Sequence, residues 1–502
     1  MAQKRYGSTW HTQRRPSNGA VINQFLRPNQ NGFRPDRSTT QHILALRILL
    51  DHAHTYKDFA TVLTFVDFSK AFDSVTWKAI RLALEAWQVP QVIIAAVFSV
   101  MEQHKLFVRT DDGDSDLFEV TIGVLQGDTL APFLFIVVLD LVLRTSLDPA
   151  LGVPLHRHSA STTTMQTRQA AAAQRTVLTD LDFADDIVLL TRNTADAQEQ
   201  LRHLEAGALK VGLKINTGKG KTEFATAPPQ LHAAPLTLAD GRQVPHVNHY
   251  KYLGADVLDP MRDFSTRKAL AWKTLTGLKP VWMSTAADST KRKLFNATVR
   301  SVFHYGAVTW GRTQAERDRI DGSMTRMLKY ALGQTGNFTL SLTDIYGKTP
   351  QATAVISAAR LRLVGHALRH REDTPQPLQH LLLWDPPLRQ RSSRLTTRRT
   401  ILDESTLTTW HDIERECKFR DSWHAHTKAM ETEMSTSSVN RRTQSSREAS
   451  PPPAPRAAKR AAPPPTRGKM NTSQAQQPPI TQPRRSERLR QKKEGISTTL
   501  HP

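Results

Sequence analysis

The spacing of apolar residues changes along the chain, and each spacing predicts a different kind of element. Residues 38–56 place apolar side chains at helical intervals, and the short β-branched run Thr61–Asp67 is typical of a buried strand. A helix is predicted from Trp77, Pro90 interrupts its pattern, and another helix is predicted over residues 92–103. The first hundred residues therefore mix helix with strand.

Two hairpins and a long helix follow. Residues 105–109 and 117–121 lie on either side of a turn-forming Asp-Asp-Gly, which predicts the first hairpin. Leu130–Ser146 is apolar nearly all round, as expected of a buried helix. Within residues 177–190, two apolar runs flank Phe183-Ala184-Asp185-Asp186, which predicts a second hairpin with carboxylates at its tip.

The rest of the chain is helical and then low in complexity. Beyond Tyr252 the apolar spacing is helical almost to Met430, whereas residues 159–175, rich in Thr, Ala and Gln, predict a loop. Residues 431–502 hold 14 Lys or Arg, 5 Asp or Glu and 11 prolines, a composition that cannot bury a core. The predicted fold class is α/β, mixed in its first part and all-α in its second, with a disordered basic tail.

Length and charge limit the classes of protein to which the chain can belong. A chain of 502 residues suggests about three domains. Its 68 Lys and Arg against 46 Asp and Glu give a formal net charge of +22, which favours nucleic acid as a partner. The single Cys417 argues against a disulfide-stapled secreted fold and against a Cys-rich zinc site. The apolar runs are too short to span a membrane and no secretory signal opens the chain, so an intracellular location is expected.

Three carboxylates stand where the pattern predicts burial. Asp67 ends an apolar strand, and Asp185 and Asp186 occupy the turn between two others. Buried carboxylates need a compensating cation, and oxygen ligands suit Mg²⁺. Two such ions about 3.5–4 Å apart activate a 3′-hydroxyl and stabilise leaving pyrophosphate. An Asp-Asp pair in a hairpin is commonly a solvated turn, so these residues alone leave both interpretations open.

Six blocks stand out along the chain, residues 30–40, 65–74, 123–132, 183–186, 212–221 and 250–254. In this order they resemble the motifs of a reverse transcriptase of the non-LTR (LINE-type) retrotransposons. Two later segments, around Tyr305-Gly306 with Trp310 and around residues 365–369, resemble the helical region that follows the polymerase in such elements. The likeness runs from about Gln30 to Met430.

The resemblance implies a right-hand polymerase, an α+β palm with partial fingers and a helical thumb. Its activity would be RNA-directed DNA polymerisation, with an RNA template, a DNA primer or target DNA and deoxynucleoside triphosphates as partners. The implied ranges are 1–60 for partial fingers, 61–258 for the palm with an inserted loop near 150–176, 259–345 for the thumb, 346–430 for a helical C-terminal region and 431–502 for the tail.

The resemblance also implies roles for single residues. Asp67, Asp185 and Asp186 would form the catalytic triad and hold two Mg²⁺ ions, with Mn²⁺ as a substitute. Four residues would contact the incoming nucleotide, and three would grip the primer terminus. The first set is Phe68, Phe72, Gln126 and Lys219, and the second is Tyr252, Leu253 and Gly254.

Several of these roles have a structural alternative. The Phe72 ring would exclude a 2′-hydroxyl and so select deoxynucleotides, or it is a plain core residue. Lys219 or Lys221 would protonate pyrophosphate, or both are solvated turn lysines. The primer grip is otherwise a simple hairpin. Lys291, Arg292, Lys293 and Arg300 either contact a duplex backbone or form the solvated face of a helix.

The chain departs from the family pattern at its start. Only about 29 residues precede the block at Gln30, and neither an endonuclease nor the first fingers motif is recognised there. A truncated copy is therefore expected, and the alternative function is a catalytically impaired nucleic-acid-binding remnant. An RNA-templated RNA polymerase is a third possibility, against which Phe72 argues. The basic cluster at residues 484–493 suggests a nuclear location.

Overall fold

The computed structural model describes residues 25–57, 59–103, 105–111, 113–155, 176–229, 234–337, 339–369, 377–384 and 396–448. The chain divides into two compact units, Met1–Ser446 and Arg447–Pro502. Three sequence predictions lie outside the described residues. They concern the loop at 159–175, the proline-rich tail beyond Glu448 and the basic cluster at 484–493.

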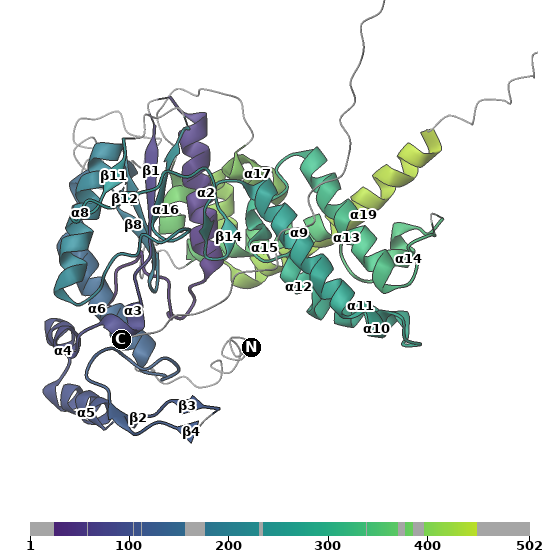
Figure 1. Cartoon of the computed structure of the whole chain (residues 1–502). Coiled ribbons are helices and arrows are strands. Elements are labelled where there is room, and N and C mark those ends of the chain that lie inside the picture. The colour runs from purple at the N-terminus through teal and green to yellow at the C-terminus, as the bar shows by residue number, and fades with distance from the viewer. Residues whose placement is uncertain are drawn as a thin grey trace, which may run out of the picture. The chain divides into compact units, whose positions relative to one another are not determined.

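A four-stranded antiparallel sheet is the centre of the first unit (Figure 1). Its strands are β1 (Thr61–Val66), β8 (Asp180–Phe183), β9 (Asp186–Thr191) and β10 (Glu223–Ala227), in the order β10-β1-β9-β8. All six residues of β1 are buried, because a β-branched apolar run suits a strand that is covered on both faces. The predicted strand and the carboxylate-tipped hairpin are both confirmed.

Helices cover the two faces of this sheet. On one face, Val62 and Val66 share a core with α4 (Trp77–Ala86), α6 (Ala131–Ser146) and α8 (Thr194–Lys210). On the other face, alternate residues of β1, Leu63 and Phe65, pack in a core with α2 (Thr39–Thr55). This division follows from the two-residue period of a strand. In Figure 1, α6 and α8 lie on one side of β1 and α2 on the other.

The helices near the C-terminal end complete the core on the α2 face. α15 (Ala352–Arg369), α16 (Pro377–Leu383), α17 (Thr397–Ser405) and α18 (Trp410–Cys417) all contribute buried apolar side chains to it. α2 contacts both α16 and α17. This helical region and the sheet therefore share one hydrophobic core.

A third core lies in the helices that follow the sheet region. It gathers Phe264, Trp282 and Trp310, whose side chains are at most 1% exposed. The elements around it are α9 (Pro260–Gly277), α10 (Lys279–Trp282), α11 (Asp288–Ala297), α12 (Val299–Phe303), η2 (Ala307–Thr309), α13 (Gln314–Ala331) and α14 (Leu342–Tyr346).

Short elements complete the region around the sheet. β2 pairs with β5 and β3 with β4, which confirms the hairpin predicted over residues 105–121. α5 is apolar yet leaves Val92 78% exposed. The elements are α3 (Ala71–Ser74), α5 (Gln91–Glu102), β2 (Lys105–Leu106), β3 (Arg109–Thr110), β4 (Gly113–Asp114), β5 (Phe118–Glu119), η1 (Pro149–Leu151), β6 (Val153–Leu155), β7 (Thr176–Leu178), β11 (Leu236–Thr237), β12 (Gln243–Val244), β13 (Lys251–Tyr252) and β14 (Ala255–Asp256).

The final helix is longer than the sequence predicts. α19 (Arg420–Glu448) continues past Met430, where disorder was expected to begin. Residues 431–448 contain neither proline nor glycine, so nothing in that stretch interrupts a helix before the proline run at 451–453. Among the described helices, none is long and apolar enough to cross a bilayer.

Candidate active site

Strand pairing brings the three predicted carboxylates to one end of the sheet. Val66 pairs with Ile187, so Asp67, the next residue, lies level with Asp186 on the neighbouring strand. Phe183 pairs with Asp186, which leaves Ala184 and Asp185 as the two-residue turn between β8 and β9. The fold therefore places three acidic side chains at adjacent strand ends, although Asp67 is more than a hundred residues away from Asp185 and Asp186 along the chain.

The block at residues 212–221 holds Asp67 in place. Asn216 Nδ2 donates to Asp67 Oδ2 at 3.0 Å, and Lys221 Nζ lies 3.3 Å from Oδ1. The backbone is tied as well, because the Asn216 N–H donates to the Asp67 carbonyl at 2.8 Å. Asp67 keeps 26% of its side chain exposed, so it stays accessible to solvent and ions.

Negative charge is in excess at this end of the sheet, and it shifts the pKa values of the carboxyl groups. Burial raises the pKa of Asp185, and burial together with the charges of Asp185 and Asp67 raises the pKa of Asp186 to about 6. Lys221 lowers both values but does not cancel the shift. Three oxygen-donor carboxylates that repel one another are a suitable ligand set for a hard divalent cation.

The carboxylates do not close on a common point. Within the described residues, no three Asp, Glu, His or Cys side chains are gathered tightly enough to hold an ion. Asp67 instead directs one oxygen to Asn216 and the other to Lys221. The donor chemistry of these side chains therefore fits a hard divalent cation, while each oxygen of Asp67 already contacts a neighbouring side chain.

Two of the predicted nucleotide contacts, Phe72 and Gln126, lie in segments that hydrogen-bond to each other. The Phe72 ring is half-buried and stacks on Phe135 with centroids 4.6 Å apart. Its carbonyl accepts a hydrogen bond from Val124 N at 2.8 Å, which joins the first catalytic block to the Gly123 block. Gln126 is exposed, and its Nε2 lies 3.4 Å from Asp73 Oδ1.

The other two nucleotide contacts are placed less favourably. Phe68 is 5% exposed and packs in the core, with a β-bridge to Ile215, so only its backbone remains for a nucleotide. Lys219 is exposed, and it is Lys221 whose ammonium meets Asp67. Of the two lysines left open by the sequence, Lys221 is the one at the triad.

The predicted primer-grip residues form a tight turn between β13 and β14. Leu253 and Gly254 have φ of 48° and 81°, as in the two-residue turns that match hairpin twist. Tyr305 Oη donates to the Leu253 carbonyl at 2.7 Å, and Arg267 donates to the Gly254 carbonyl. The Tyr252 side chain is buried and donates to the Leu181 carbonyl at 3.1 Å, so it faces the core.

Sequence reasoning assigned no role to Tyr250 beyond the first position of a block. Its ring stacks on Phe65 with centroids 3.9 Å apart, and its hydroxyl donates to the Lys221 carbonyl at 2.9 Å. Burial and the nearby carboxylates of Asp186 and Asp67 raise its pKa. The spacing of residues in the sequence does not reveal these contacts, because Tyr250 meets Phe65 and Lys221 only in the folded chain.

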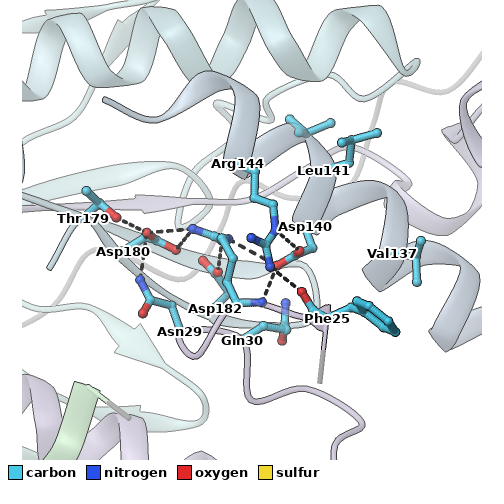
Figure 2. A network of polar contacts seen from close by, with 12 residues as sticks. Phe25, Asn29, Gln30, Val137, Asp140, Leu141, Arg144, Thr179, Asp180 and Asp182 are labelled. Atoms are coloured by element: carbon cyan, nitrogen blue, oxygen red, sulfur yellow. Dashed lines mark hydrogen bonds and ion pairs between the residues drawn. The ribbon is translucent and has the colours of Figure 1, made fainter. Parts of the chain in front are cut away.

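A second group of three carboxylates, on α6 and β8, is fully buried. Asp140, Asp180 and Asp182, labelled in Figure 2, all form ion pairs with the guanidinium of Arg27. The nitrogen–oxygen distances are 3.2, 2.9 and 2.6 Å, respectively. The Asp140 carboxylate also accepts from Arg144 at 2.8 Å. This cluster joins the segment before α2 to α6 and β8.

The pKa values of Asp180 and Asp182 shift in opposite directions. Burial tends to lower the pKa of Arg27, but Asp180, Asp182 and Asp140 raise it overall. Arg27 lowers the pKa of Asp180 despite burial, whereas burial and the charge of Asp180 raise that of Asp182. Because all three carboxylates are inaccessible, the cluster is structural.

Comparisons with known proteins agree with the geometry. A family model described as reverse transcriptase (RNA-dependent DNA polymerase) matches residues 3–257. A Pol polyprotein from a type-2 retrotransposable element of Drosophila melanogaster is 29% identical over 235 residues, 45% of this chain and 20% of that protein. A Pol polyprotein from a type-1 retrotransposable element of Nasonia vitripennis is 29% identical over 202 residues, 38% and 18% of the two chains.

Two other likenesses differ in extent. A putative transposon-derived protein of Caenorhabditis elegans is 27% identical over 266 residues, which cover 48% of this chain and 93% of that protein. A telomerase structure from Candida tropicalis is 14% identical and covers 73% of this chain and 54% of its own, but its TM-score of 0.30 is too low to support an argument.

The chain spans about a fifth of the Drosophila and Nasonia polyproteins. The family match nevertheless covers more than half of the chain and includes Asp67, Asp185 and Asp186. The chain therefore belongs to the reverse transcriptase family, in the non-LTR retrotransposon branch that its six sequence blocks indicate.

Proposed function

We propose that this chain copies an RNA template into DNA by nucleotidyl transfer at Asp67, Asp185 and Asp186. One observation carries the proposal. The strand register brings these carboxylates to one end of the sheet, where burial and mutual repulsion raise the pKa of Asp185 and Asp186. A site of that charge is suited to divalent cations and to substrates that carry them, such as deoxynucleoside triphosphates.

Two Mg²⁺ ions, or Mn²⁺ in their place, would supply activation of the primer 3′-hydroxyl and shielding of the phosphates. Asp67 and Asp185 would hold both ions, and Asp186 would complete the ligand set. Asn216 orients the Asp67 carboxylate through its 3.0 Å hydrogen bond. The protein's own contribution is position and electrostatics rather than covalent chemistry.

Phe72 is proposed to select the sugar. Its ring is backed by Phe135, which limits its freedom to move away from a bulkier substrate. A ring fixed in this way excludes a 2′-hydroxyl, and Gln126 on the neighbouring loop would contact the same nucleotide. Phe68 and Lys219 would contribute backbone and long-range charge, respectively.

Lys221 is proposed to donate the proton that the leaving pyrophosphate takes up. Its ammonium lies 3.3 Å from Asp67, and its backbone carbonyl is fixed by Tyr250. Movement of Asp67 toward a cation would release the ammonium toward the phosphates. The turn of Leu253 and Gly254, held by Tyr305 and Arg267, would support the primer terminus.

The template and primer are proposed to bind largely through charge. The formal net charge of +22 predicts affinity that weakens steeply as salt rises. The predicted nuclear location rests on the basic cluster at residues 484–493.

Primer extension on an RNA template tests the proposal. The wild type is expected to extend the primer with deoxynucleotides and Mg²⁺, and Asp185→Asn to lose synthesis while keeping RNA affinity. Asp318→Asn, at an exposed position on α13, is the matched control and should behave as the wild type. RNA binding without synthesis by the wild type would instead support a catalytically impaired remnant.

A further inference from the structure

The residue before the catalytic Asp185 has an unusual backbone conformation. Ala184 has a φ of 57°, in the left-handed region that residues with a Cβ adopt at a cost of about 1–2 kcal/mol. A two-residue hairpin turn requires such angles, yet Ala184 is not glycine. Something outside the hairpin must therefore stabilise this turn.

One side-chain amide meets both polar groups of Ala184. Gln30 Oε1 accepts from Ala184 N at 2.9 Å, and Gln30 Nε2 lies 3.4 Å from the Ala184 carbonyl. The same Oε1 accepts from Gly32 N at 2.6 Å. Gln30 is fully buried, so water does not compete for these bonds.

The backbone around Gln30 is fixed to the same hairpin. Asn31 N donates to the Asp182 carbonyl at 2.8 Å, and Asp182 N donates to the Asn29 carbonyl at 3.0 Å. Gln30 thus forms a parallel bridge with Asp182 and covers the outer edge of β8. In Figure 2, Asn29 and Gln30 lie beside Asp182.

Gly32 shows how close this approach is. A Cβ at residue 32 would lie 2.3 Å from Ala184 N, which no real side chain tolerates. The segment at residues 29–32 can therefore reach the turn only with glycine at this position.

We propose that Gln30 is a positioning residue for Asp185. Its amide holds Ala184 in the left-handed conformation and so fixes the direction in which the next residue presents its carboxylate. A displacement of about 1 Å in such a group lowers a rate by as much as about 10²-fold. The effect on synthesis rests on the proposed polymerase function, whereas the hold on the turn does not.

Hydrogen exchange in the full-length protein tests the hold directly. Gln30→Met keeps the length of the side chain but removes its hydrogen bonds to Ala184 and to Gly32. The peptide containing Ala184 should therefore exchange its amide hydrogens faster than in the wild type. Gly32→Ala, which pushes on the turn from the other side, should have the same effect. Gln314→Met, at an exposed position on α13, is the matched control and should leave this peptide unchanged.

Primer extension on an RNA template tests the consequence. Both variants are expected to lower kcat by about 10²-fold while KM for deoxynucleotide and RNA affinity stay near the wild-type values. Unchanged exchange at Ala184 in both variants would overturn the proposal, as would faster exchange with undiminished kcat. Exchange needs no activity, so it remains decisive even where the wild type synthesises no DNA.

Discussion

Asp67 and Phe72 illustrate how much a single side chain's neighbours matter at this site. Asp67 is shared between Asn216 and Lys221, and Phe72 is backed by Phe135. Both residues belong to one sequence block, whereas the neighbours of Asp67 lie about 150 residues further along the chain and Phe135 lies between the two segments. The variants that separate the proposed roles are therefore those that change one partner and leave the other in place.

The two lysines of the Gly-Lys-Gly-Lys segment should differ in effect. Lys221→Met removes the ammonium at Asp67 and is expected to lower the rate of nucleotide addition by about 10²-fold or more, the usual contribution of a general acid. Lys219→Met is the matched control, because the ammonium that meets Asp67 is that of Lys221. Single-turnover extension measures both, and equal losses would contradict the assignment of Lys221.

Sugar selection should depend on the Phe72 ring. Phe72→Val opens space beside Phe135, so discrimination against ribonucleotides is expected to fall by about 10²-fold. The ratio of kcat/KM for deoxynucleotide and ribonucleotide measures it. Phe107→Val, at an exposed position, is the control. An unchanged ratio in Phe72→Val would assign this ring to the core alone.

The sequence blocks located the proposed triad because its carboxylates lie at the ends of strands with strong apolar patterns. Gln30, Arg27 and Tyr250 were not assigned, because each acts through hydrogen bonds or stacking with residues that only the fold brings near. The basic residues on α11 and α12 show that a sequence pattern can also suggest a binding role for residues that support the fold. Arg292 and Arg300 donate to the backbone carbonyls of residues 344, 345, 350 and 351, so these guanidinium groups support the fold instead of facing a duplex.

At the scale of elements, the apolar pattern predicted the helices and strands well but not how they join. β1 is buried on both faces because α2 lies behind it, and the C-terminal helices in turn cover α2. Nothing in the local spacing says that α16 and α17 pack against α2, since that contact joins segments more than three hundred residues apart. The domain ranges that the resemblance implies, from the partial fingers to the tail, remain predictions.

Asp51 links α2 to α17 and to the loop before α13. It lies on α2, ion-pairs with Arg47 and with Arg312 at 3.0 Å, and accepts from Thr397 N and Oγ1 at 2.8 and 2.6 Å. Asp51→Ala leaves two largely buried guanidinium groups without this carboxylate and is expected to lower the free energy of unfolding by about 3–5 kcal/mol. Urea denaturation measures the loss.

The control for Asp51 is Asp318→Ala on the exposed face of α13, expected to change stability by at most about 0.5 kcal/mol. A loss as small as the control's in Asp51→Ala would mean that α2 and α17 are held by apolar packing alone.

At the scale of the whole molecule, buried histidines should make stability fall in acid. Burial lowers the pKa of His304 to about 3, and the charge of Arg300 lowers it further. The unfolded chain binds a proton near pH 6.5 and the folded one does not, so stability falls as pH drops from about 6.5 toward 3. At pH 5 this amounts to about 2 kcal/mol for such a group.

His304→Gln removes this contribution. The variant is expected to lose about 2 kcal/mol less than the wild type when urea denaturation is carried out at pH 5 instead of pH 7.5. His203→Gln, at a partly exposed position on α8, is the comparison and should track the wild type. Parallel losses in His304→Gln and the wild type would show that His304 is not held neutral by the fold.

The central claim is RNA-templated DNA synthesis at the carboxylate edge of the sheet, and a Mg²⁺ titration of primer extension tests it most directly. We expect the wild type to make DNA only when Mg²⁺ is added, and Asp67→Asn to make none at any Mg²⁺ concentration while binding the template equally well. DNA synthesis by Asp67→Asn at the wild-type rate would contradict the account.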